Sequence, residues 1–224
     1  MRRVLAVVAI DIDGTLTPIK SSWSYLHYVL GTRERSRGFM RLFFDGLISY
    51  EEWVFLDLGL WKGLRYEVFK RVLESIPWRA GVEELRRVVE KWRGRALFVA
   101  ITAGFAELGA RAVRELGFDA YVGTEVEVVD GRLSGRPRRF IDFDGKDRAL
   151  LELMESLGVV PSVPLVSVGD SIVDRPLFEM SEVSIAFCAD PDLEADVRVG
   201  CSLRDLARVL DKVLETVTHG VTRS

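Results

Sequence analysis

The stretch Val4–Thr17, with the sequence VLAVVAIDIDGTLT, constrains the fold of this chain more than any other. Its apolar first part, Val4–Ile10, is typical of a strand buried on both faces, as in a parallel sheet. Asp11 and Asp13 follow directly, and Gly14 lets the backbone approach a ligand closely. Because open α/β sheets bind ligands at the carboxyl ends of their strands, we expect both carboxylates at such a crevice. Taken alone, the stretch also fits an ordinary polar turn after a strand.

The composition limits the classes of protein to which the chain can belong. It has 224 residues, 48% of them hydrophobic, and a formal net charge of -3, which suits one or two domains with a sizeable core. This charge gives no electrostatic footprint for nucleic acid. No apolar run approaches the ~20 residues that cross a membrane, and the first run leads into Asp11 without a cleavage site. We expect a cytoplasmic protein without nucleic-acid or membrane partners.

The two cysteines, Cys188 and Cys201, do not form a CxxC motif. They therefore indicate neither a zinc site nor a disulfide framework. A single bridge between them is one option, but we expect two free thiols in a reducing compartment.

After Pro18 the composition changes to an aromatic-rich, helical pattern. Helices are predicted over residues 21–30, 34–44, 50–60 and 65–76, and Ser49 and Glu52 have the spacing of a capping box. Aromatic residues at helical spacing predict the core of a small helical bundle. They are Trp23, Tyr25, Phe39, Phe43, Phe44, Trp53, Phe55, Trp61 and Phe69.

From Arg79 onward the pattern alternates between strands and helices. Strands are predicted over residues 95–101, 164–168, 184–188 and 197–199, with a hairpin over 121–133 at Asp130-Gly131. Helices are predicted over residues 81–92, 105–116, 146–157 and 202–217. The expected fold class is therefore α/β, a doubly wound parallel sheet with a helical insertion after the first strand.

Three predicted strands end in polar groups that the sheet would bring to one edge: Asp11 with Asp13, Thr102, and Asp170 with Asp174. Carboxylates in a cleft hold Mg²⁺ through hard oxygen ligands. A hydroxyl and the free N–H groups of a Thr-Ala-Gly turn can cradle phosphate oxygens. Lys146 is the candidate that neutralises developing charge, although a solvated surface lysine is its simpler interpretation. Together these groups are what phosphoryl transfer requires.

These segments resemble, in order, the four motifs of the haloacid dehalogenase (HAD) superfamily of phosphohydrolases. They are Asp11–Thr17 (DIDGTLT), Ile101–Gly104 (ITAG), Lys146 and Val168–Asp174 (VGDSIVD). The first and fourth are specific, whereas the second and third are weak alone but correctly placed. The resemblance implies a Rossmann-like catalytic core of residues 1–17 and 79–224. Residues 18–78, the helical insertion, then stand where the phosphoserine-phosphatase-like branch has a helical cap domain.

The resemblance also implies a role for each matched residue. Asp11 would be the nucleophile that forms an aspartyl-phosphate, and Asp13 the general acid and base. The implied Mg²⁺ site comprises Asp11, the backbone carbonyl of Asp13, Asp170, and Asp174 as a ligand or a support. The implied phosphoryl-binding groups are Gly14, Thr102, Ala103 and Lys146. The implied substrate is a small phosphorylated metabolite, and the oligomeric state stays open, with a homodimer among the options.

Two positions depart from the pattern of phosphoserine phosphatases. Those enzymes carry a glutamate nine residues after the nucleophile, where it helps to hold the amino acid, and this chain has Lys20 there. They usually have Asn before the last acid of the fourth motif, and this chain has Val173. A cation in place of an anion disfavours an ammonium-bearing substrate and favours an extra anionic group. We therefore predict a small phosphomonoester other than phosphoserine, with a merely solvated Lys20 as the alternative.

Other functions compete with this interpretation. Phosphoserine phosphatase proper, a phosphotransferase or a phosphomutase would share the first chemical step. A receiver-like phospho-acceptor is not an enzyme, and it lacks both a second carboxylate at the position of Asp13 and a helical insertion. A dinucleotide-binding domain would need G-x-G-x-x-G after the first strand, which this chain does not have.

Overall fold

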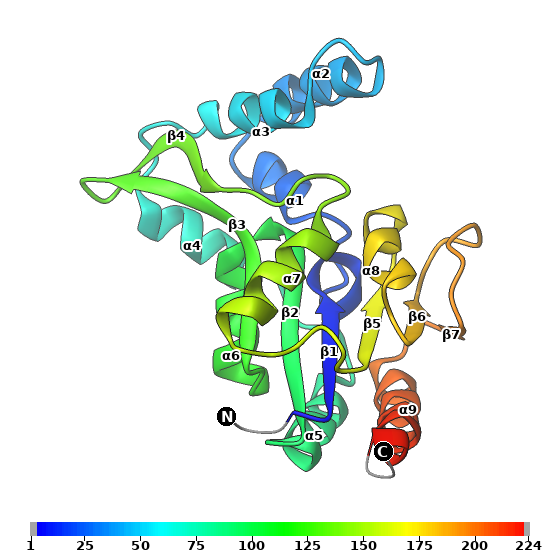
Figure 1. Ribbon diagram of the computed structural model, residues 1–224. Helices are drawn as coiled ribbons and strands as arrows, with labels where there is room; N and C mark the ends of the chain where they lie inside the picture. Colours follow the sequence, from blue (N-terminus) through cyan, green and yellow to red (C-terminus); the bar gives the residue numbers. More distant parts are fainter. Residues whose placement is uncertain (1–3, 222–224) are drawn as a thin grey trace.

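Residues 4–221, which this computed structural model describes, form a seven-stranded sheet flanked by helices (Figure 1). The strands are β1 (Ala6–Asp11), β2 (Ala96–Phe105), β3 (Ala120–Val129), β4 (Arg132–Arg139), β5 (Leu165–Gly169), β6 (Val183–Phe187) and β7 (Val197–Val199). Their order in the sheet is β4-β3-β2-β1-β5-β6-β7, so β1 is central. Every neighbouring pair is parallel except β3 and β4. The predicted α/β class is confirmed.

Helices cover both faces of this sheet. They are α5 (Val82–Trp92), α6 (Ala106–Leu116) and α9 (Leu203–Val221) on one face, and α7 (Lys146–Ser156) and α8 (Arg175–Glu179) on the other. Alternate residues of a strand point to opposite faces, and in β1 Val8 and Ile10 join the first core while Val7 and Ala9 join the second. All of these side chains are fully buried, which is why the strand reads as a continuous apolar run. The sequence analysis did not identify α8.

Strand β2 is longer than predicted. It continues past Ile101 to Phe105, and its pairing with β3 shifts register over that interval. The Thr-Ala-Gly segment therefore lies within an irregular end of the strand and not after it. The irregularity moves these residues out of regular pairing at the carboxyl edge of the sheet.

The helical insertion contains α1 (Ser22–Val29), α2 (Arg33–Phe44), α3 (Tyr50–Gly59) and α4 (Tyr66–Glu74). The predicted capping box is confirmed, because Ser49 Oγ accepts from Glu52 N (3.1 Å) and Glu52 Oε2 accepts from Ser49 N (2.7 Å). Main-chain hydrogen bonds at Gly63 and Leu133 tie the insertion to the β3–β4 hairpin (2.8 Å). Figure 1 shows α1, α2 and α3 beyond the carboxyl edge of the sheet. Within residues 4–221, no helix has both the length and the apolar character of a membrane span.

The aromatic residues of the insertion form a core only in part. Trp61 and Phe69 are buried as predicted, but Phe44 is 67% exposed and Phe55 is 38% exposed. Helix α2 buries none of its residues. The prediction that these residues form the core of the bundle is therefore confirmed only in part, because α2 lies at the outer end of the insertion.

Cys188 and Cys201 form a disulfide, so the prediction of two free thiols is wrong. The physical reason lies in the strands that precede them. Phe187 of β6 pairs with Val199 of β7, and parallel strands end at the same edge of a sheet. Cys188 follows Phe187 directly and Cys201 comes two residues after Val199, with their Cα atoms 4.4 Å apart. Cys188 is the last residue of the predicted strand 184–188, and Cys201 lies two residues after the predicted strand 197–199. These positions were the signal for the pairing.

Reduction of this disulfide is expected to destabilise the fold. A bridge between residues 13 positions apart restricts the unfolded chain, which corresponds to about 3 kcal/mol in the free energy of unfolding. Denaturant unfolding with and without reductant measures the difference. The double variant Cys188→Ser, Cys201→Ser is the control and should not respond to reductant. An identical midpoint for the native chain under both conditions would contradict the expectation.

Candidate active site

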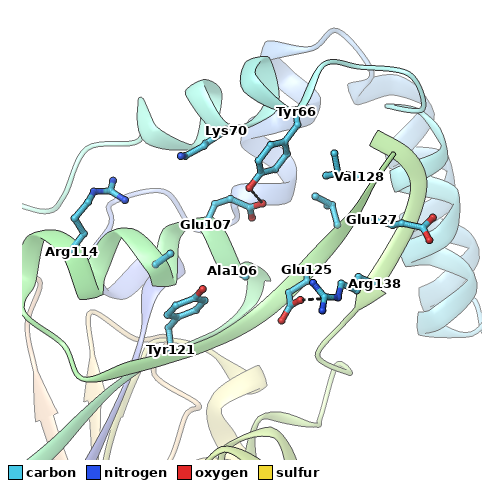
Figure 2. A pocket seen from close by; sticks show the side chains of 12 residues that line it. Tyr66, Lys70, Ala106, Glu107, Arg114, Tyr121, Glu125, Glu127, Val128 and Arg138 are labelled. Atoms are coloured by element: carbon cyan, nitrogen blue, oxygen red, sulfur yellow. Dashed lines mark hydrogen bonds and ion pairs between the residues drawn. The ribbon is translucent and has the colours of Figure 1, made fainter. Parts of the chain in front are cut away.

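A cavity of about 650 Å³ lies between α4, α6 and the β3–β4 hairpin (Figure 2). Its charged side chains largely balance one another, as Glu125 pairs with Arg138 at 3.7 Å. Glu107 accepts a hydrogen bond from the Tyr66 hydroxyl (3.1 Å). Within the described part of the chain, none of the residues that line this cavity is a predicted site residue. The candidate site lies elsewhere.

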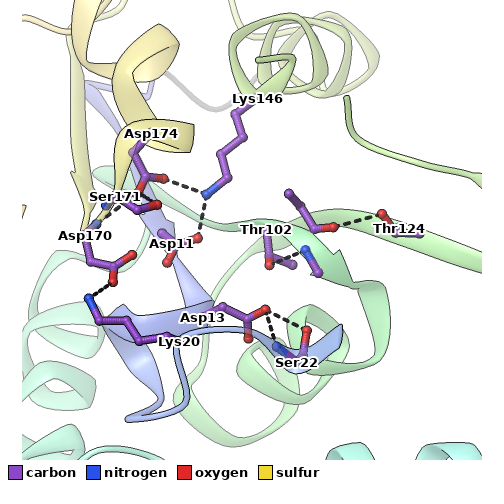
Figure 3. Close-up of polar contacts among 12 residues, drawn as sticks. Asp11, Asp13, Lys20, Ser22, Thr102, Thr124, Lys146, Asp170, Ser171 and Asp174 are labelled. Atoms are coloured by element: carbon purple, nitrogen blue, oxygen red, sulfur yellow. Dashed lines mark hydrogen bonds and ion pairs between the residues drawn. The ribbon is translucent and has the colours of Figure 1, made fainter. Parts of the chain in front are cut away.

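Polar side chains from separate segments meet at the carboxyl edge of the central strands (Figure 3). Asp11 is the last residue of β1, and Asp170 follows β5, its parallel neighbour. Asp174 stands four residues later, in the turn before α8. Carboxylate oxygens of these three residues all lie within 4.8 Å of one another, and all three residues are buried. The sheet thus brings together the acids that the sequence analysis placed at one edge.

This buried cluster has the properties of a cation site. Several buried carboxylates are costly together unless positive charge compensates them. Asp11 Oδ2 has no hydrogen-bond partner among residues 4–221. The donor set consists of oxygen atoms alone, which hard divalent cations prefer. The residues present therefore fit a metal ion.

Lys146 supplies one positive charge to the cluster. Its Nζ donates to Asp11 Oδ1 and to Asp174 Oδ1, both at 2.6 Å. Burial acts to lower the pKa of Lys146, but the two carboxylates outweigh it and raise that pKa above its ordinary value. The side chain is only 2% exposed, so the alternative of a solvated surface lysine is wrong.

One ammonium group does not fully compensate the acids. Burial raises the pKa of Asp11 well above its usual range; Lys146 opposes this, whereas Asp174 and Asp170 add to it. Burial likewise raises the pKa of Asp170, against the effect of Lys20. A further cation among these groups would favour their ionised forms.

Asp13 lies apart from the three clustered acids. Its Oδ2 accepts from the backbone N (2.9 Å) and the Oγ (2.6 Å) of Ser22, and its Oδ1 has no partner in the described region. Burial raises the pKa of Asp13, and the two Ser22 hydrogen bonds oppose this. The sequence analysis did not identify this contact, because a hydrogen bond between residues nine positions apart has no sequence motif. The first helix of the insertion therefore orients Asp13.

The turn after Asp11 requires a glycine. Gly14 has φ +84°, and a Cβ there would overlap the Asp170 carboxylate. Its N–H donates to Ile19 O (2.7 Å), so this donor is already used within the turn. Arg79 holds the same turn from outside, donating to Gly14 O (2.7 Å) and Thr15 O (3.1 Å). No sequence signal pointed to Arg79.

The second motif lies beside Asp13. Thr102 Oγ1 accepts from Gly104 N (2.8 Å), and Ala103 O accepts from Trp23 Nε1 (3.2 Å) of the insertion. A Cβ on Gly104 would overlap the side chains of Ser22 and Asp13. The irregular end of β2 and the start of α1 are therefore in direct contact.

Lys20 forms an ion pair with Asp170. Its side chain is 57% exposed, so the ammonium reaches from the rim of the site to the acid cluster. Figure 3 shows Lys20 and Lys146 on different sides of the cluster.

Most of the predicted groups line one cavity of about 180 Å³, but Gly14, Asp170 and Asp174 are not among its lining residues. Its polar lining residues are Asp11, Asp13, Lys20, Ser21, Thr102, Lys146 and Ser171. Aromatic lining comes from Trp23, Tyr50, Trp53 and Phe143. A ligand whose small anionic group bound among the polar side chains would therefore place the rest of the molecule against these aromatic side chains, most of which come from the insertion.

Comparison with protein families gives one match over most of the chain. Residues 8–179 match the family of haloacid dehalogenase-like hydrolases. The matched range includes the acid cluster, Lys146 and the whole helical insertion.

Individual proteins similar to this chain are named phosphoserine phosphatases. The phosphoserine phosphatase of Methanocaldococcus jannaschii is 25% identical over 217 residues, covering 94% of this chain and 98% of that protein. The phosphoserine phosphatase of Archaeoglobus fulgidus is 35% identical over 145 residues, covering 64% of this chain and 41% of that protein. A solved structure of a phospho-aspartyl intermediate analogue of phosphoserine phosphatase has a TM-score of 0.74 and 23% identity. It covers 92% of this chain and 99% of that one, which supports the fold.

The close packing of the acid cluster leads to a testable prediction. A Cβ at Gly169 would overlap the Asp174 side chain, so Gly169→Ala should lower the free energy of unfolding by about 1–3 kcal/mol. Gly38→Ala is the matched control, because Gly38 lies within α2 with open space around it. That control should stabilise the chain by up to about 1 kcal/mol. Denaturant unfolding measures both, and equal effects of the two substitutions would contradict the packing argument.

Proposed function

We propose that this chain, which belongs to the haloacid dehalogenase-like hydrolase family, is a Mg²⁺-dependent phosphatase acting on a small phosphomonoester. The observation that carries the proposal is the buried cluster of Asp11, Asp170 and Asp174 with Lys146 bound to two of its members. The same cavity holds Asp13 and Thr102. These are the groups that phosphoryl transfer to a carboxylate and subsequent hydrolysis require.

Asp11 is the proposed nucleophile. Lys146 holds one of its oxygens, and the other has no hydrogen-bond partner among the described residues. A carboxylate oxygen of Asp11 attacks phosphorus, the bond from phosphorus to the ester oxygen breaks, and an aspartyl-phosphate forms. Lys146 fixes the attacking carboxylate and stabilises the negative charge on the phosphoryl oxygens.

Asp13 is the proposed general acid and base. It faces the same cavity as Asp11, outside the acid cluster, with Ser22 holding one oxygen and the other unpartnered in the described region. In the first step it gives a proton to the leaving alkoxide. In the second it takes a proton from the water that attacks phosphorus, which releases inorganic phosphate and restores the Asp11 carboxylate.

The remaining groups bind and orient. The proposed Mg²⁺ ligands are Asp11, the backbone carbonyl of Asp13, and Asp170, with Asp174 as a ligand or a support. Bound there, Mg²⁺ would screen the repulsion between substrate and carboxylate and stabilise the charge of the transition state. The Thr102 hydroxyl and the Ala103 backbone are proposed to bind phosphoryl oxygens. Gly14 is proposed to shape the turn and not to donate to the phosphoryl group, because its N–H already donates to Ile19 O.

The substrate is proposed to be a phosphomonoester other than phosphoserine. Lys20 lines the cavity and places a cation beside the site, where it would repel the ammonium group of an amino acid. Phosphoserine phosphatase remains the second candidate function, favoured by the names of the relatives. The chemistry of the site is common to both candidates, so the substrate distinguishes them.

Asp11→Asn should reduce the turnover of p-nitrophenyl phosphate in the presence of Mg²⁺ by roughly a thousandfold or more, because an amide is a poor nucleophile. The release of inorganic phosphate and circular dichroism would be measured together. Asp144→Asn, a change to an exposed acid near Lys146, is the control and should keep full activity. Retained activity in Asp11→Asn would eliminate Asp11 as the nucleophile, and activity that resists EDTA would contradict the metal assignment.

Lys20→Gln should raise the ratio of kcat/KM for phosphoserine to that for p-nitrophenyl phosphate by about fivefold. Loss of the repulsion between Lys20 and the ammonium group of phosphoserine corresponds to about 1 kcal/mol in a partly exposed site. Glutamine is chosen because it is neutral and places no negative charge beside Asp170. Lys62→Gln removes the same charge from an exposed position of the insertion and should leave the ratio unchanged. A native chain that prefers phosphoserine to other monoesters would contradict the proposed substrate class.

A further inference from the structure

A second cavity continues from the candidate active site into the helical insertion. It measures about 470 Å³, against about 180 Å³ for the cavity that holds the catalytic groups. The two share lining residues Lys20, Ser21, Trp23 and Trp53, so they adjoin there. The part of a substrate that lies beyond the phosphoryl group can therefore extend between α1, α2 and α3. The second cavity is larger than the serine part of phosphoserine would fill.

Asp57 contributes a buried carboxylate to this second cavity. Asp57 is 3% exposed, and its Oδ2 lies 3.3 Å from His27 Nε2. Its Oδ1 is also buried and has no hydrogen-bond partner among residues 4–221. A buried acceptor without a donor is unfavourable, so this oxygen is suited to a donor that enters from the cavity.

A buried histidine lies against this carboxylate. His27 Nδ1 lies 2.8 Å from Thr32 Oγ1. The same hydroxyl oxygen accepts a hydrogen bond from Trp61 Nε1 (3.1 Å). An unprotonated Nε2 would place its lone pair against the Asp57 carboxylate, so the proton belongs on Nε2. His27 Nε2 lies near Oδ2 without forming a hydrogen bond among residues 4–221, and Asp57 Oδ1 also stays without a partner there.

A matching donor lies one helical turn away on the same helix. Trp53 and Asp57 are spaced i, i+4 in α3 and line the same cavity. Trp53 Nε1 is buried and has no hydrogen-bond partner in the described part of the chain. An unpaired acceptor and an unpaired donor together match a hydroxyl group, which both donates and accepts.

We propose that Asp57 and Trp53 recognise a hydroxyl group on the leaving alcohol, so that the preferred substrates are phosphomonoesters of polyhydroxylated alcohols, such as sugar phosphates. This inference rests on the proposed phosphatase function. An ammonium group on the substrate would also donate to Asp57. However, Lys20, Arg33 and Arg37 line the same cavity, and their positive charges disfavour a cationic substrate. The indole faces of Trp23 and Trp53 supply apolar surface for the C–H groups of such a compound.

The test compares esters of matched size with and without hydroxyl groups. Glucose 6-phosphate and cyclohexylmethyl phosphate form one pair, and glycerol 3-phosphate and propyl phosphate form a second; p-nitrophenyl phosphate reports basal chemistry. The native chain is expected to show at least a tenfold higher kcat/KM for the hydroxylated member of at least one pair. No preference for the hydroxylated member of either pair would overturn the inference.

Asp57→Asn tests the assigned residue. Because His27 Nε2–H requires an acceptor, the amide oxygen should face His27 and the amide NH₂ should face the cavity, which removes the acceptor. For the preferred hydroxylated ester, kcat/KM should fall at least tenfold, mainly through KM, and at least five times more than for its hydroxyl-free partner. Equal loss on both esters would indicate a merely structural role and overturn the inference.

Two further variants keep this test decisive. Trp53→Phe removes the donor while retaining the aromatic ring, and it should lower the same ratio if Asp57→Asn fails to fold. Asp205→Asn changes an exposed acid of α9 and should alter neither value. A Trp53→Phe variant with the native ratio would count against the hydroxyl site. If the native chain turned over none of the esters, p-nitrophenyl phosphate included, the proposed function itself would fail, and this inference with it.

Discussion

The buried ammonium of Lys146, bound between Asp11 and Asp174, is the interaction on which the site depends. Without it, carboxylates from β1 and from the segment after β5 would repel one another in a region with little water. The ion pair holds together three segments that are far apart in sequence. Lys146 is the first residue of α7, so the start of that helix contacts the acid cluster.

Most of this arrangement could be predicted from the sequence, because it follows from sheet geometry. A doubly buried strand that ends in Asp11, and a second that ends before Asp170, must deliver both acids to one edge if the strands are parallel neighbours. The alternation of strands and helices gives that parallel sheet. The burial of Lys146 was not predictable in this way, since most lysines are exposed and its partners come from other segments.

What the sequence did not reveal depends on contacts between distant segments. Ser22 holds Asp13 and Arg79 holds the Gly14 turn, and neither contact has a local pattern. The Cys188–Cys201 disulfide did have a signal, because each cysteine lies at or near the end of a predicted strand, but the two strands had first to be placed side by side. The exposure of Phe44 shows the opposite limit: an aromatic residue at helical spacing marks a packing face only if another layer covers it.

The insertion contacts the core beside the acid cluster and also encloses the second cavity. Asp13 accepts from Ser22, and the Ala103 carbonyl accepts from Trp23, so the insertion contacts the candidate site at two points. Trp53 and Asp57, in contrast, lie on α3 and have no hydrogen bond to the acid cluster among the described residues. Substitutions on α3 can therefore change the shape and polarity of the second cavity while Asp11, Lys146 and Asp174 keep their mutual contacts. In the proposed function, the acid cluster would carry the chemistry and α3 would contribute to substrate choice.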